Sequence, residues 1–251
     1  MFYSKANSII PALIILLSGL LLGSSCNETI LPASPLHQSY FGLEPGAVRE
    51  YMIDSIQYRE TLSNDTSRWY VKEEIGEMYT DLEGKTAYSI LRYKRRNESS
   101  SWVFDNTWTA RITDNQAEWV ENNLRYIKLT FPPNFGKRWK GHIHLGGLSS
   151  VPVSESCNNL SLLEDWDFEY TEVHSPFILG DFQFDSTVTV LQQGQQNLIE
   201  FNESIEVYAK GVGLVERQFY HYTTQEICPS CPWNEKVACG YSVMVQLLNY
   251  Q

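Results

Sequence analysis

Four cysteines have the spacing that points most directly to chemistry. They are Cys157, Cys228, Cys231 and Cys239, and a fifth, Cys26, lies far upstream. In an oxidising compartment four thiols predict two disulfides. All three pairings are open. We favour Cys228 with Cys239 across a hairpin and Cys157 with Cys231, because the second bond would also hold a long middle loop.

The segment Cys228-Pro-Ser-Cys231 also has the spacing of two zinc ligands. A zinc ribbon needs a second closely spaced pair, which the sequence lacks. A redox-active pair is typical of a helix N-terminus, where the thiol pKa falls, and Pro229, Pro232 and the β-type composition do not favour such a helix. The disulfide interpretation is therefore preferred to the metal and redox alternatives.

His142 and His144 would lie on one face of a strand, the geometry of a two-histidine metal site. No Asp, Glu or third His lies within a few residues to complete a ligand set. We therefore expect a loop in which both imidazoles are solvated. The sequence predicts no metal and no other cofactor.

Five aromatic residues are the candidates for ligand binding. On a concave sheet, aromatic side chains supply a large apolar and stacking surface. The alternative for each of them is an ordinary place in the core. The candidates are Trp69, Tyr88, Trp102, Trp108 and Tyr126.

No familiar catalytic motif supports enzyme activity. The sequence has no Gly-x-Ser-x-Gly, no phosphate-binding loop and no His-Glu-x-x-His, and its acidic residues are too scattered to nominate an acid/base pair. We assign no catalytic residue. A hydrolase without a recognisable motif ranks third among the functional classes.

The elements that must position these residues are strands. Segments rich in β-branched and aromatic residues recur with short polar turns between them, and no run of helical periodicity dominates. Residues 132–161 are expected to form a long loop, and Gly211 and Gly213 a bend. The last strand should pair with the strand that starts at Leu214. The expected strands are 48–58, 69–75, 86–93, 102–112, 124–131, 165–174, 184–192, 198–201, 214–222 and 241–250.

This pattern predicts an all-β protein with minor α content, in which an antiparallel meander forms an open or half β-barrel. The apolar and aromatic content, 43% hydrophobic with seven Trp and fifteen Tyr, indicates a packed core. We expect one domain at residues 41–251.

The N-terminus has the layout of an export signal. Lys5 precedes an apolar run at 9–22, which leads into Gly23-Ser-Ser-Cys26. The run is shorter than the ~20 residues that span a bilayer, and Pro11 interrupts it. The end of the run resembles the bacterial lipobox, except that Gly23 stands where an apolar residue is usual. The resemblance implies cleavage before Cys26 and acylation of its thiol, for example with palmitate.

Residues 1–25 are thus the predicted signal peptide, and 26–40, interrupted by Pro32 and Pro35, a flexible tether. Loss of Lys5 with the signal takes the formal net charge from −11 to −12. This charge repels polyanions, so no nucleic-acid partner is expected. The longest basic run, Lys94-Arg-Arg96, is interpreted as a solvated strand end.

Several short motifs carry a resemblance to a known group. Residues 40–46, 51–56 and 208–215, together with Leu129-Thr-Phe-Pro132, resemble uncharacterised lipoproteins that are common in Bacteroidetes. The element Gly211-Val-Gly-Leu-Val215 is also similar to one in half-barrel periplasmic lipoprotein carriers. The resemblance implies the fold and no catalytic residue.

Together these features predict an outer-membrane lipoprotein, facing the periplasm or the cell surface and held to the membrane by acyl chains at Cys26. Its expected role is a non-catalytic binding module for an apolar or glycan ligand. The alternative is a structural or interaction component of a cell-envelope protein complex. The partner would accordingly be a lipid, a glycan or an envelope protein. A lined cavity would favour the first role and a flat aromatic patch the second.

Overall fold

The computed structural model describes residues 37–251, except 61–62, 114, 147–149, 152–159 and 162–165. The predicted signal peptide, Cys26, most of the predicted tether and Cys157 lie outside the described residues. Residues 37–251 belong to one compact unit. No helix within the described part of the chain is long and apolar enough to cross a membrane.

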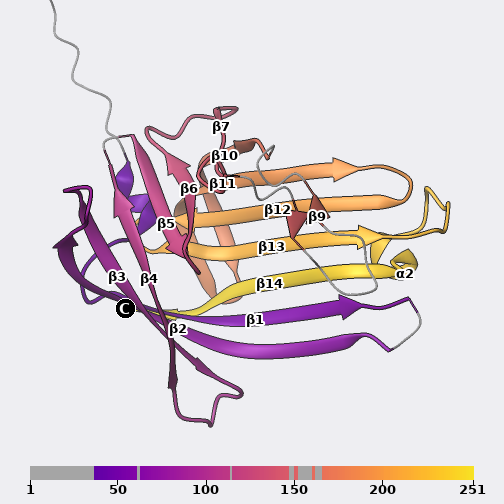
Figure 1. The fold of residues 1–251 in the computed structure, drawn as a ribbon, viewed down its shortest axis with the longest axis horizontal. Coiled ribbons are helices and arrows are strands. Elements are labelled where there is room, and N and C mark those ends of the chain that lie inside the picture. Colours follow the sequence, from indigo (N-terminus) through magenta and orange to yellow (C-terminus); the bar gives the residue numbers. More distant parts are fainter. Residues whose placement is uncertain (1–36, 61–62, 114, 147–149, 152–159, 162–165) are drawn as a thin grey trace, which may run out of the picture. The chain divides into compact units, whose positions relative to one another are not determined.

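The structure is nearly all β, as predicted, with a twelve-stranded antiparallel sheet that curls toward a barrel. Figure 1 shows the sheet as two meanders, the first of β1–β6 and the second of β10–β14, which meet where β1 pairs with β14. The order along the sheet is β6-β5-β4-β3-β2-β1-β14-β13-β12-β11-β10-β7, and β8 pairs with β9 in a separate ribbon. The strands are β1 (Val48–Tyr58), β2 (Asp65–Thr80), β3 (Thr86–Arg95), β4 (Val103–Ile112), β5 (Gln116–Glu121), β6 (Leu124–Thr130), β7 (Arg138–Trp139), β8 (Ser150–Val151), β9 (Leu160–Ser161), β10 (Phe168–Leu179), β11 (Phe182–Gln196), β12 (Glu200–Ala209), β13 (Gly213–Thr223) and β14 (Cys239–Tyr250).

Most expected strands are present, and β1 has the predicted bounds. The expected pairing of the last strand with the strand at Leu214 is confirmed, because β14 pairs with β13 from Cys239 to Gln246. The six-residue strand β5, in which Ala117 and Glu118 are both buried, was not predicted from the sequence. The expected loop at 132–161 contains the two-residue strands β7, β8 and β9. Two short helical turns complete the described elements, η2 (Gln38–Phe41) and α2 (Trp233–Lys236).

The two edges of the sheet approach each other, which makes the curvature nearly closed. The hydroxyl of Tyr170 on β10 accepts a hydrogen bond from the Thr130 amide of β6 (3.1 Å) and donates one to the Thr130 carbonyl (2.9 Å). The Ile127 amide donates to the Gly141 carbonyl (2.8 Å), and the indole of Trp139 donates to the Ile127 carbonyl (2.9 Å). The side chains of Tyr170 and Trp139 and the backbone at Gly141 thus link β6 to the other edge of the sheet, where no strand ladder among the described residues does so.

The main core fills the inside of this curved sheet, between β2–β6 on one side and β10–β12 on the other. Its largest fully buried side chains include Tyr40, Tyr170 and Phe168. The members of the cluster are Tyr40, Phe41, Leu43, Ile75, Ile90, Ala110, Ala117, Leu129, Phe131, Leu145, Trp166, Phe168, Tyr170, Val188, Val190 and Tyr208. Burial of this apolar surface is the principal stabilising term for such a sheet.

The segment η2 joins the N-terminal end of the domain to the bend between β12 and β13. Tyr40 is fully buried, and its hydroxyl lies 2.5 Å from Nδ1 of His174 and 2.6 Å from Oγ of Ser186. The Gly211 amide donates to the Ser39 carbonyl (2.9 Å). The predicted tether therefore ends earlier than residue 40, because residues 38–40 are packed onto the domain.

Candidate functional site

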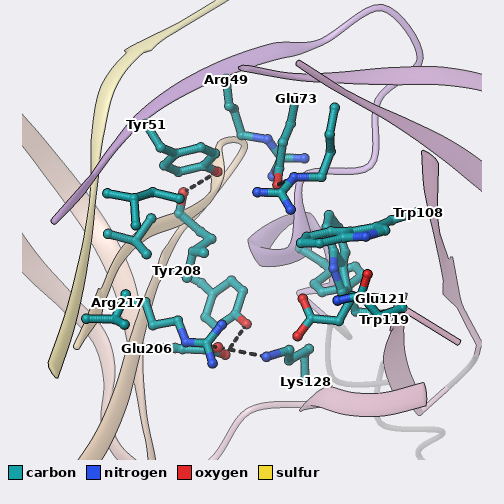
Figure 2. Close-up of a pocket in the computed structure, with 17 residues that line it drawn as sticks. Arg49, Tyr51, Glu73, Trp108, Trp119, Glu121, Lys128, Glu206, Tyr208 and Arg217 are labelled. Carbon is teal, nitrogen blue, oxygen red and sulfur yellow. Dashed lines mark hydrogen bonds and ion pairs between the residues drawn. The ribbon is translucent and has the colours of Figure 1, made fainter. Parts of the chain in front are cut away.

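A cavity of about 270 Å³ lies on the inner face of the sheet. Figure 2 shows its lining. Side chains from the first meander, the second meander and η2 all reach it, so only the folded sheet assembles it. The lining residues are Phe41, Arg49, Tyr51, Ile53, Glu73, Arg92, Trp108, Trp119, Glu121, Asn122, Lys128, Glu206, Tyr208, Leu214, Arg217, Val243 and Val245.

One wall of the cavity is aromatic. The rings of Trp108 on β4 and Trp119 on β5 meet edge to face, with centroids 6.1 Å apart and planes at 81°. Phe41 packs on the other side of Trp119 with centroids 5.9 Å apart, also edge to face. Edge-to-face packing is the geometry that aromatic pairs prefer, so this wall is preorganised.

A row of charges crosses three neighbouring strands on the same inner face. Arg49 of β1 stands opposite Glu73 of β2, and Glu73 stands opposite Arg92 of β3. The Glu73 carboxylate forms an ion pair with Nε of Arg92 (3.2 Å). The Arg92 guanidinium in turn lies 3.5 Å from the ring centroid of Trp108, a cation–π contact. Glu73 and Arg92 thus balance each other's charge, and Arg92 lies against one edge of the aromatic wall.

Arg49 lacks such a pairing. Its side chain is buried with the residue only 3% exposed, and Nη1 donates to the Val212 carbonyl (3.2 Å). Nε and Nη2 make no hydrogen bond to any described residue. The glycine at 213 makes room for this guanidinium, because a Cβ there would lie 2.1 Å from Nη1.

A buried ion pair occupies the opposite side of the cavity (Figure 2). Glu206 on β12 is 1% exposed; it accepts hydrogen bonds from Nζ of Lys128 (2.7 Å) and from the Tyr208 hydroxyl (2.6 Å). Nε of Arg217 lies 3.6 Å away. The pair links β6 to β12 across the inside of the sheet and therefore contributes to the shape of the cavity.

Burial alone would raise the pKa of the Glu206 carboxyl, but Lys128, Arg217 and the two hydrogen bonds outweigh burial and hold the pKa below its usual range. Because the folded-state pKa is the lower one, the pair contributes stability above the unfolded-state pKa of about 4.3 for Glu. That stability is lost as the pH falls through the folded-state pKa.

Of the five aromatic candidates from sequence, the cavity contains Trp108 alone. Tyr88 and Tyr126 are half-buried and pack against the main core. Trp69 is 37% exposed with the Arg96 guanidinium 4.7 Å from its ring, and Trp102 lies beneath Arg95 at 4.1 Å. These four aromatic residues therefore do not line the cavity. Lys94 and Arg96 are exposed at the end of β3, as expected, and both cations also lie near the ring of Trp69. Arg95 is half-buried over Trp102.

Residue type and spacing did not identify Phe41, Trp119 and Tyr208 in the lining, or any charged residue of the cavity. The available signal was alternation in β1, where Arg49, Tyr51 and Ile53 share one face. A cation at an alternate position among apolar residues marks an inward-facing charge.

The preferred disulfide pairing is wrong. Cys228 is bonded to Cys231, with the Cα atoms 5.4 Å apart. The Cys231 amide donates to the Cys228 carbonyl (3.3 Å), so the tight turn already brings these two side chains together. Cys239 starts β14 opposite Thr223 and is also disulfide-bonded.

The bond between Cys228 and Cys231 also removes the zinc interpretation of this pair, although Glu226 lies close enough to both sulfurs to complete a ligand group. A thiolate and not a disulfide binds zinc. The segment serves to fix the connection between β13 and β14.

The histidines at 142 and 144 differ from each other, contrary to the expectation that both are solvated. They lie in a turn. His142 is 6% exposed, with ring centroids 5.1 Å from those of both Trp166 and Phe168, whereas His144 is exposed. His142 is therefore part of the core.

No family model and no curated protein matches this chain. Among solved structures, the chain is similar to a Bacteroides fragilis protein described as exported and as having a YmcC-like fold, with 9% identity and a TM-score of 0.39 over 84% of this chain and 98% of that chain. It is also similar to a protein from Parabacteroides distasonis described as a lipoprotein, with 10% identity and a TM-score of 0.40 over the same shares. At this level of similarity nothing about the activity or the partners of this chain follows.

Proposed function

We propose that this chain is an envelope lipoprotein whose folded domain binds a small, largely apolar ligand in the cavity on the inner face of its sheet. The observation that carries the proposal is the cavity itself. Its volume of about 270 Å³ is near the lower end of ligand pockets, and its lining combines aromatic and aliphatic walls with a few charged groups. A flat aromatic surface, the feature expected of a protein-docking component, would have supported the alternative role.

Three properties of the lining favour binding over ordinary packing. The aromatic wall of Trp108 and Trp119 is held in place by neighbours on both sides. Ile53, Val243 and Val245 are half-buried, so apolar surface faces the cavity. The charged groups come from separate strands and point into the same space (Figure 2). Preorganised walls lower the entropic cost of holding a ligand.

The proposal is tested by filling the cavity. We expect Ile53→Trp to abolish one-to-one binding of the uncharged probe 2-naphthalenemethanol, measured by isothermal titration calorimetry on the full chain in detergent with a detergent blank. The matched control is Ile56→Trp, on the same strand and also half-buried but outside the lining. Saturable binding by wild type and the control, and none by Ile53→Trp, is the expected pattern. Absence of binding by wild type, or unchanged binding by Ile53→Trp, would contradict the proposal.

The proposed location rests on the N-terminal signal and on the lipobox resemblance at Cys26. Acyl chains on that thiol would hold the mature protein at the outer membrane. We expect Cys26→Ala to remove the acyl anchor, so that less of the protein is recovered in the detergent-extracted membrane fraction than for wild type. Labelling with radioactive palmitate should likewise be lost. A variant that stays fully in the membrane fraction would show that the apolar run is itself the anchor.

A further inference from the structure

Arg49 is a buried cation whose hydrogen-bonding groups are only partly satisfied within the fold. The residue is 3% exposed, and Nε and Nη2 have no hydrogen-bond partner among the described residues. Its cross-strand neighbour Glu73 is paired with Arg92 instead. A buried guanidinium is costly unless an anion or several acceptors compensate it.

The unmatched atoms belong to one side of the guanidinium. Nε and Nη2 form the fork that binds the two oxygens of a carboxylate or a phosphate, while Nη1 is held by the Val212 carbonyl. The fold therefore fixes the plane of the group and leaves its recognition edge open.

A second donor in the same cavity also lacks a partner. Nε1 of Trp108 is buried and makes no hydrogen bond to the described residues. Trp108 and Arg49 come from different strands, and both line the cavity. Nε of Arg92 and Nε of Arg217 also make no hydrogen bond to the described residues, but each lies within ion-pair distance of a carboxylate. Buried polar atoms are satisfied in the great majority of native structures, so the unmatched donors of Arg49 and Trp108 indicate a bound acceptor.

The charge balance of the lining agrees. Four cations and three carboxylates line the cavity, which leaves one net positive charge. Arg92 is paired with Glu73, Lys128 is paired with Glu206, and Arg217 interacts with both Glu206 and Glu121. These three cations balance the three carboxylates, so the excess charge lies at Arg49, in a protein that is acidic overall.

We infer that the ligand carries an acidic oxyanion head, a carboxylate or a phosphate monoester, which binds Nε and Nη2 of Arg49. Its apolar body lies against the aromatic wall of Trp108 and Trp119. This inference rests on the proposed function and specifies its ligand class. Arg49 supplies selectivity for the charged head, and the aromatic wall supplies most of the contact area.

The test compares three naphthalene probes of the same apolar body, namely 2-naphthoate, 2-naphthyl phosphate and 2-naphthalenemethanol. Each is titrated into the full chain by calorimetry. We expect at least one acid to bind wild type more tightly than the alcohol. Arg49→Met should weaken binding of that acid by about 10- to 100-fold, because a hydrogen-bonded charge pair is lost, and should leave the alcohol nearly unchanged. The acid that binds more tightly identifies the head group.

Two further variants keep the result interpretable. Arg138→Met is the matched control, since that arginine has a 66% exposed side chain and lies outside the cavity, and it should change no affinity. Arg49→Lys keeps the charge but not the fork, and should weaken acid binding less than Arg49→Met does. If wild type binds the alcohol as tightly as both acids, or if Arg49→Met binds the acids unchanged, the inference fails while the proposed function stands. If wild type binds none of the three, both fail.

Discussion

Replacing Lys128 by methionine is expected to lower the free energy of unfolding by about 3 to 5 kcal/mol, because it leaves the Glu206 carboxylate buried without its closest cation. The Lys128 side chain is 9% exposed and that of Glu206 1%, and the ammonium lies 2.7 Å from the carboxylate. Urea unfolding at neutral pH, followed by tryptophan fluorescence, measures the change.

The control for burial is Lys94→Met. Lys94 forms an ion pair of almost the same length with Asp105 (2.6 Å), but the two side chains are 46% and 28% exposed. This substitution should cost less than about 1 kcal/mol. Adding Glu206→Gln to Lys128→Met should recover much of the lost stability, because the uncompensated charge is then gone. If Lys94→Met and Lys128→Met lower the free energy of unfolding equally, burial does not make the Lys128–Glu206 ion pair more important for stability than an exposed one.

Gly42→Ala is expected to be the second large loss, roughly 2 to 5 kcal/mol. The glycine has φ +64°, a conformation that costs an L-residue about 1 to 2 kcal/mol, and a Cβ would lie 2.4 Å from the Val212 carbonyl oxygen. The backbone of η2 or of the bend at 211–213 would have to move. Thermal unfolding by circular dichroism provides the measurement.

Gly46→Ala separates the two causes. Gly46 has φ +86°, but a Cβ there meets nothing within 4 Å. It should therefore show only the cost of the backbone conformation, with a smaller fall in melting temperature than Gly42→Ala. If the two variants melt together, the close packing of η2 on the bend does not stabilise the domain.

This contact also explains why two stretches that are far apart in the sequence are both distinctive. Residues 40–46 and the Gly211-Val-Gly213 element meet in the fold, with Gly42 against Val212 and the Gly211 amide bonded to Ser39. Gly213 has φ +99° and makes room for Arg49. The glycine pair predicts a bend from the sequence alone. The room that Gly213 makes for Arg49, a residue 164 positions away, is visible only in the structure.

The fold class was predictable because it depends on local signals. The composition of β1 and the turn residues on its flanks were sufficient to give its bounds, and an antiparallel meander follows from many such strands with short connections. β5 was missed because it has six residues and little alternation of polar and apolar side chains.

The site was less predictable. Choosing residues by aromatic type identified Trp108 but not Trp119, since residue type does not indicate which part of a curved sheet a side chain reaches. Charged residues lie mostly at the surface of proteins, so residue type alone gives no reason to place Arg49 and Glu206 in the interior. The predicted cysteine pairing was wrong because Cys228 and Cys231 lie close together within one four-residue turn and bond there, and not across the hairpin.

The central claim is that the cavity holds a small ligand, and native mass spectrometry of the full chain purified from its own envelope in mild detergent tests it most directly. We expect a fraction of wild-type protein to carry one additional small molecule per chain, released on denaturation, and the same purification of Ile53→Trp to carry none. An acidic group on that molecule would agree with recognition by Arg49. Wild-type protein that carries no small molecule but is recovered with a stoichiometric protein partner would contradict the account and favour an assembly role.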